Sequence, residues 1–239
     1  MPRRYAFTVS NEHHEEHHRN LSDGWARASI FGMADGLVTN VALMLGFAGA
    51  AAEPSSVRLA GLAGLVAGGF SMASGEYLSM QAQKELFERE IEVERKSLRE
   101  NPVEERAELV ALFEERGVDP SLSGLLADEL MRDPELALRT HAREELGVDP
   151  TAIGSPWRAA VGSLVSFAVG AFIPLVPWLV NQNGKPIDVS IGLGVVAAGT
   201  LGGAIGKMTG RGAFRSALRF LAISTASAAV TYVVGAAIG

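Results

Sequence analysis

Five long apolar stretches constrain the fold of this chain more than any other feature. Each is about 20 residues or longer, which is the length that an α-helix needs to cross the hydrocarbon core of a bilayer. Small residues recur within them at spacings that let membrane helices approach closely. We therefore expect an all-α membrane protein with five transmembrane helices, near residues 28–52, 57–80, 157–181, 187–207 and 214–238.

The charged residues are gathered between the second and third stretches. The chain is 48% hydrophobic yet 20% charged, and residues 81–156 hold 19 of its 27 acidic and 10 of its 21 basic side chains, a local net charge of −9. Such an acidic segment repels phosphate backbones and attracts cations, so no nucleic acid partner is expected. The predicted divisions are a tail at 1–27, spans at 28–80, an acidic insert at 81–156 and spans at 157–239.

The insert carries start and stop signals for short helices. Asn101-Pro102, Asp119-Pro120 and Asp133-Pro134 have the pattern of helix N-caps, and Gly117 and Gly147 that of helix ends. No glycine or proline lies between residues 76 and 99, so the second span is expected to continue out of the membrane as one helix. Three short helices on a long stalk are predicted.

Basic residues near the short loops predict the orientation. The connection between the fourth and fifth spans is rich in them, whereas the opposite loops carry only Arg58 and Lys185. This predicts a cytoplasmic N-terminus, a cytoplasmic insert and an external C-terminus. The first 27 residues lack the pattern of a signal peptide, which fits a bacterial inner membrane. The basic residues are Lys207, Arg211, Arg215 and Arg219.

Four polar or thioether side chains within the first two spans are candidates for an ion path. A carboxylate in hydrocarbon costs roughly 2.5–3.5 kcal/mol, so Asp35 is a functional candidate by default, with Asn40 beside it. Met72 and Glu76 lie four residues apart on one face of the second helix and offer ligands for a borderline metal such as Fe²⁺. The alternatives are a structural hydrogen bond or ion pair for Asp35, packing for Met72, and simple solvation for Glu76.

Carboxylates and one imidazole in the insert are candidates for a metal-binding surface. Glu105 pairs with Glu108 at helical spacing, and His141 pairs with Glu145 beside Glu144. Such a donor set suits Fe²⁺ or Mn²⁺. The alternative is a set of solvated helix faces in which glutamates pair with nearby arginine or lysine.

The N-terminal tract Glu12–His18 is rich in histidine and glutamate. It is either a weak metal-binding tail or a flexible extension. With no cysteine in the chain, oxygen, imidazole and thioether groups are the ligands that remain.

Three segments together resemble the vacuolar iron transporter family. They are FGMADGLVTNVALMLG in the first span, GGFSMASGEYLSMQAQ in the second, and HAREELG near the end of the insert, followed by three further apolar spans. The resemblance extends from about residue 27 to the C-terminus. It implies a five-span homodimer that exchanges cytosolic Fe²⁺ or Mn²⁺ for protons, with the ion path between subunits and metal bound by the insert.

The resemblance also implies roles for individual residues. It puts Asp35 and Met72 at the membrane ion site. It points to metal ligands at Glu94, Glu105, Glu108 and Glu145. The chain departs from the family pattern where His141 and Ala142 replace methionines, and where Ser97 and Gly64 replace acidic residues; His141 is then a substitute ligand.

The expected function is proton-coupled export of Fe²⁺ or Mn²⁺ from the cytoplasm, with no enzymatic activity and no cofactor beyond the transported ion. One alternative is a membrane-anchored di-iron oxidase built on the insert carboxylates and His141. Bundles of that kind use Glu-x-x-His motifs, whereas Leu138 stands where the glutamate would be. A second alternative is a metal-sensing membrane protein without transport.

Overall fold

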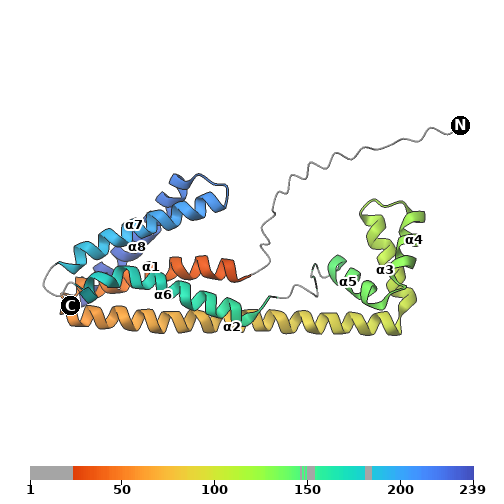
Figure 1. Cartoon of the computed structure of the whole chain (residues 1–239), viewed down its shortest axis with the longest axis horizontal. Coiled ribbons are helices and arrows are strands. Elements are labelled where there is room, and N and C mark those ends of the chain that lie inside the picture. The colour runs from red at the N-terminus through yellow and green to blue at the C-terminus, as the bar shows by residue number, and fades with distance from the viewer. Residues whose placement is uncertain (1–23, 146, 148, 150–153, 181–184) are drawn as a thin grey trace.

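The computed structural model describes residues 24–145, 147, 149, 154–180 and 185–239, and within them it contains helices and no strand. Five helices are long and apolar enough to cross a membrane, which confirms the expected all-α fold with five spans. They are α1 (Gly24–Gly49), α2 (Pro54–Glu100), α6 (Pro156–Val180), α7 (Pro186–Met208) and α8 (Ala213–Ile238). Figure 1 shows these helices as one bundle, with a smaller group of helices held away from it by α2.

The span boundaries follow the apolar stretches closely. The ends of α6, α7 and α8 lie within one residue of those expected. The first span ends earlier, at Gly49 rather than 52, because Ala51 adopts a left-handed conformation (φ 53°) that turns the chain into α2. The predicted N-terminal tail 1–27, with its histidine-rich tract, lies largely outside the described residues.

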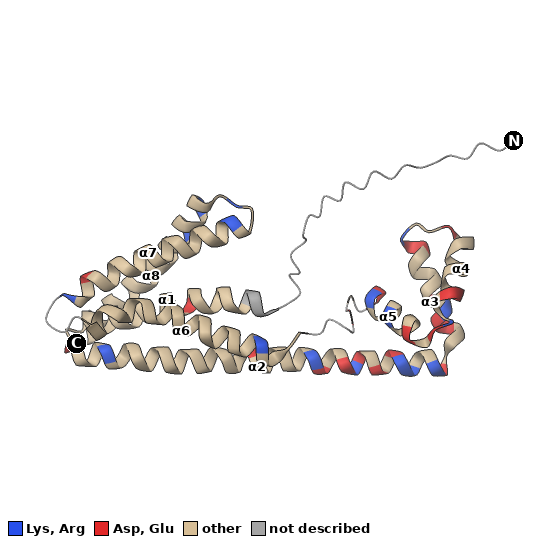
Figure 2. Ribbon diagram, viewed as in Figure 1, with Lys and Arg blue, Asp and Glu red and all other residues tan. Residues whose placement is uncertain are grey.

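Helix α2 is 47 residues long and belongs to both parts of the molecule. Its first half packs in the bundle against α1 and α6, and its second half carries the helices of the insert. Charged side chains become dense on α2 where it leaves the bundle (Figure 2). The prediction of one helix continuing through residues 76–99 is confirmed.

The insert contains α3 (Pro102–Glu115), α4 (Pro120–Leu130) and α5 (Pro134–Glu144), each beginning with proline as expected. Asp119 accepts a hydrogen bond from the Ser121 amide, and Asp133 caps α5 in the same way. Asn101 differs from the prediction, because its side chain makes no capping hydrogen bond although α3 begins directly after it. Leu109, Phe113 and Ala127 form a small core between α3 and α4. The side of the membrane that the insert occupies stays a prediction.

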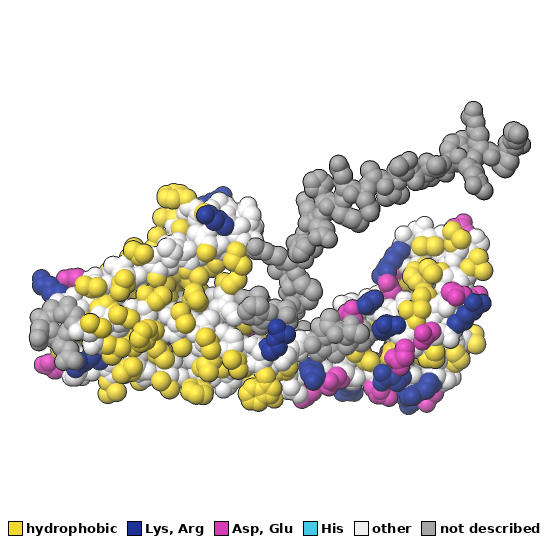
Figure 3. All heavy atoms as spheres, in the orientation of Figure 1, with side chains coloured by type: hydrophobic (Ala, Val, Ile, Leu, Met, Phe, Trp, Pro, Cys, Tyr) yellow, Lys and Arg dark blue, Asp and Glu magenta, His cyan; other side chains and the backbone are white. Residues whose placement is uncertain are grey.

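Helices α1 and α6 pack with their backbones in direct contact. A Cβ atom on Gly36 would lie 2.2 Å from the Phe167 carbonyl oxygen, and one on Gly170 would lie 2.2 Å from the Met33 carbonyl oxygen. Close approach through small residues is how membrane helices gain packing energy where lipid supplies no hydrophobic drive. Not every small residue of the apolar stretches makes such a contact, since a Cβ atom on Gly192 of α7 would have no neighbour within 4 Å. Hydrophobic side chains cover the visible outer face of the bundle, as a lipid-facing surface requires (Figure 3).

Candidate functional site

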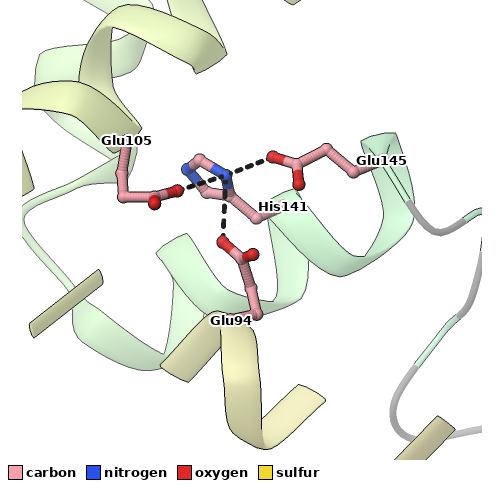
Figure 4. Close-up of side chains that lie close together, drawn as sticks. All are labelled: Glu94, Glu105, His141 and Glu145. Atoms are coloured by element: carbon pink, nitrogen blue, oxygen red, sulfur yellow. Dashed lines mark hydrogen bonds and ion pairs between the residues drawn. The ribbon is translucent and has the colours of Figure 1, made fainter. Parts of the chain in front are cut away.

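Four ligand-bearing side chains meet where α2, α3 and α5 come together (Figure 4). Glu94 comes from the outer half of α2 and Glu105 from the first turn of α3. His141 lies in the last turn of α5, and Glu145 is the C-cap residue directly after that helix. One ligand atom from each lies within 4.8 Å of the others. Among the described residues, no other group of three or more acidic or histidine side chains meets this criterion.

The imidazole of His141 lies at the centre of the group. Its Nδ1 atom is 2.7 Å from a carboxylate oxygen of Glu145, 3.2 Å from one of Glu94 and 3.7 Å from one of Glu105. The side chain is fully buried, and its Nε2 atom has no hydrogen-bond partner. A single N–H cannot serve three carboxylates, and buried oxygens of Glu94 and Glu105 accept no hydrogen bond.

Burial and mutual repulsion make the group attractive to a cation. The pKa of Glu94 is raised to about 7, mainly by burial and also by the charges of Glu145 and Glu105, against the lowering influence of His141. Burial also raises the pKa of Glu105. Three carboxylates around one imidazole retain negative charge and unsatisfied acceptors, both of which a bound divalent cation relieves. Oxygen and imidazole donors together suit a borderline ion such as Fe²⁺ or Mn²⁺.

The other two insert candidates lie outside this group. Glu108 is exposed one turn beyond Glu105, near enough for its charge to contribute to the raised Glu105 pKa. Glu144 forms an ion pair with Arg116 of α3 instead. The structure thus unites four of the six acidic or histidine candidates of the insert.

The exposed carboxylates along α2 lie on a solvated helix face, which was the alternative to a metal-binding surface. Lys84 is 3.5 Å from Glu88, and Arg95 is 2.7 Å from Glu92, at the helical spacings that favour such pairs. Glutamates on this outer face are therefore solvated and paired, whereas Glu94 turns inward toward α5.

In the membrane half, Asp35 is partly exposed on α1 and accepts a hydrogen bond from the Thr39 hydroxyl at 3.3 Å. Sequence reasoning did not single out Thr39, although its position one turn after Asp35 was a readable signal. No cation pairs with Asp35 among the described side chains. Of the alternative explanations for this residue, a structural hydrogen bond is present, whereas the side chain of Arg27, the nearest basic residue in the sequence, lies outside the described part of the chain.

The other membrane candidates have different surroundings. Asn40 is buried, and its Nδ2 atom donates to the Ala171 carbonyl oxygen at 2.6 Å, which ties α1 to α6. Met72 and Glu76 lie one turn apart on α2 and are each partly exposed. The described geometry assigns Asn40 to helix packing, while Asp35, Met72 and Glu76 keep accessible surface.

Comparison with known proteins adds an independent observation. Residues 26–236 match the VIT family. Over 226 residues, the chain is 30% identical to a vacuolar iron transporter 1 of Oryza sativa subsp. japonica, covering 94% of this chain and 90% of that protein. It is 37% identical over 163 residues to a vacuolar iron transporter of Acanthamoeba castellanii, covering 68% of this chain and 59% of that protein. A vacuolar iron transporter 1 of Arabidopsis thaliana is 29% identical over 222 residues, or 92% of this chain and 88% of that protein.

Proposed function

Because this chain belongs to the VIT family, we propose that it is a metal transporter that exports Fe²⁺ or Mn²⁺ from the cytoplasm in exchange for protons. The names of its relatives support iron as the transported ion. Five apolar helices of sufficient length support its place in a membrane. Manganese, proton exchange and the direction of transport are parts of the proposal.

The observation that carries the proposal is the four-donor group of the insert, Glu94, Glu105, His141 and Glu145. This group captures the ion from solution. Glu108 lies close by and raises the local negative charge, which attracts cations to the surface, whereas the charge of Glu144 is compensated by Arg116. A proton leaves Glu94 when the ion binds, since a metal ligand must be deprotonated and this carboxyl has a pKa of about 7.

The membrane step uses Asp35, Met72 and Glu76. Asp35 supplies a negative charge within the membrane-spanning part of α1, and Met72 adds a soft thioether that coordinates Fe²⁺. Glu76 lies one turn from Met72, toward the insert, and takes up a proton as the ion moves on. All three keep exposed surface in one chain, which supports a homodimer whose second copy completes the path. Asn40 contributes by fixing α1 against α6.

The connectivity supports the proposed orientation. Helix α2 leaves the bundle at the end from which α6 returns, so the α7–α8 turn lies at that same end as the insert (Figure 1). This turn is the basic segment that the positive-inside rule places in the cytoplasm. The insert is then cytoplasmic and the C-terminus external, while the bacterial inner membrane stays a prediction.

The test is ion flux through the purified chain in liposomes carrying a pH gradient. We expect uptake of Fe²⁺ and Mn²⁺ that stops when a protonophore removes the gradient. Metal binding without flux would instead identify a sensor and overturn the transport proposal. Oxygen consumption on adding Fe²⁺ to the detergent-solubilised protein would revive the di-iron oxidase.

A further inference from the structure

Four basic side chains around the α7–α8 turn have no acidic partner. Lys207 ends α7, Arg211 lies in the turn, and Arg215 and Arg219 follow on α8 at intervals of four residues. All four are exposed, and none forms an ion pair within the part of the chain that the structure describes. Many cations of the insert, by contrast, pair with a glutamate or aspartate. This cluster of four positive charges without acidic partners, next to apolar helices, is suited to bind an anionic ligand.

The three arginines of this cluster line one cavity. Its volume is about 700 Å³, and its walls include Arg211, Arg215 and Arg219 together with Ser216. The N-terminus of α8 lies at the same place and has no side-chain cap, so its free amides add partial positive charge. Guanidinium groups bind phosphate in a bidentate manner, which makes this cavity suited to a phosphate ester.

A second cavity lies next to the basic one and is apolar. It has a volume of about 370 Å³ and shares Ser216 and Arg219 with the first. Its remaining walls come from both helices of the hairpin, with Ile205 of α7 and Phe220 and Ile223 of α8. The combined space therefore has a cationic mouth and a hydrocarbon-lined extension, which matches a molecule with an anionic head and an apolar tail.

We propose that this pair of cavities binds an anionic phospholipid, with its phosphate at Arg211, Arg215 and Arg219 and an acyl chain along the groove between α7 and α8. Basic pockets between membrane helices on the cytoplasmic side bind such headgroups. Free phosphate would leave the apolar cavity unused. Exposed Phe214 and Leu218 beside the arginines place the cluster at the border of the hydrocarbon, where a lipid headgroup lies. Figure 3 shows basic side chains at this end of the bundle beside hydrophobic ones.

The experiment is native mass spectrometry of the full-length protein in detergent with added lipid. Phosphatidylglycerol and phosphatidylcholine with identical acyl chains are compared. We expect the anionic lipid to bind roughly 100-fold more tightly, with a loss of about fivefold for each arginine removed, so that the triple change R211Q/R215Q/R219Q abolishes the preference. If the triple variant does not fold, the single exposed change Arg215→Gln tests the same loss.

The matched control removes the same number of charges elsewhere. R89Q/K96Q/R99Q on the exposed outer face of α2 should leave lipid binding unchanged. Millimolar inorganic phosphate should not displace the bound lipid; displacement would show an anion site without lipid selectivity and overturn the proposal. Equal retention of the two lipids would overturn it as well. So would a change of oligomeric state in the triple variant with unaltered lipid retention, which would assign the cluster to a contact between subunits. None of these outcomes depends on metal transport.

Discussion

In the insert, four ligand side chains from α2, α3 and α5 converge within 4.8 Å, whereas in the membrane half Asp35 has one described polar contact, with Thr39 of its own helix. The first group lies within one chain around the buried His141, with Glu145 at its exposed edge. The second keeps accessible surface on every carboxylate. The two candidate sites therefore differ in how they are assembled: the insert group is preorganised by tertiary packing within one chain, whereas the proposed membrane site depends on a further element, proposed to be a second copy.

The largest effect should come from Asp35→Asn. The change removes the charge that offsets the cost of bringing a cation into hydrocarbon, so pH-driven flux of Fe²⁺ in liposomes should fall roughly 100-fold. Binding of Mn²⁺ to the insert, measured by calorimetry on the full chain, should not change. Asp188→Asn, at the exposed start of α7, is the control and should transport normally. Undiminished flux through the Asp35 variant would remove Asp35 from the ion path.

A second variant changes the insert site and leaves the membrane residues intact. Glu94→Gln together with Glu105→Gln removes two of the four converging ligands, so Mn²⁺ affinity in calorimetry should fall by about 100-fold. Flux at saturating metal should persist, because the membrane residues are untouched. Glu129→Gln with Glu135→Gln, both exposed, is the matched control. Equal affinity in the double variant and the wild type would disprove the insert site.

A pH dependence should distinguish the enclosed site. The pKa of Glu94 is raised from 4.5 to about 7, so its contribution to folding stability is fully present below pH 4.5 and is lost as the pH rises through 7. The metal-free insert should therefore be more stable near pH 5 than near pH 8, while metal affinity changes in the opposite direction. Hydrogen exchange of α5 amides, corrected for intrinsic rates, measures this stability. Glu94→Gln should flatten the profile, and an unchanged slope would contradict the assignment.

The smallest effect concerns the scaffold of the insert. Asp119→Ala removes the carboxylate that accepts a hydrogen bond from the Ser121 amide, and should therefore destabilise the start of α4. Asn101→Ala is the matched control, because Asn101 occupies the same kind of position without a capping bond. Local hydrogen exchange in α3 and α4 compares the two. Similar losses of helix stability in both variants would show that the capping hydrogen bond of Asp119 does not stabilise α4.

The elements of this fold were largely predictable because their causes are local. Apolar length determined the five spans, and the absence of glycine and proline from residues 76–99 determined the continuous α2. Asp119 and Asp133 cap helices through bonds to residues two or three positions away. The failure of Asn101 to cap shows the limit, since residue type permits a bond that the backbone geometry here does not form.

The composition of the site was less predictable because it depends on contacts between distant helices. Helical spacing predicted Glu105 and Glu108 equally as metal ligands. In the structure Glu105 is buried against His141, whereas Glu108 is exposed. Glu94 was named by family resemblance, and only the packing of α5 on α2 explains why it differs from Glu92. The close contact of α1 with α6 at Gly36 and Gly170 was also missed, because nothing in either apolar stretch identifies its partner.

The unbroken course of α2 has a consequence for how ions move. Glu76 and Glu94 lie 18 residues apart on this helix. At a rise of 1.5 Å per residue, they are about 27 Å apart along the helix axis. No ion can touch both at once, and a straight helix cannot shorten to bring them together. For the proposed transport this means that an ion bound by the insert must be released into water before it reaches Glu76, so we expect the insert to raise the local ion concentration and not to pass ions on directly.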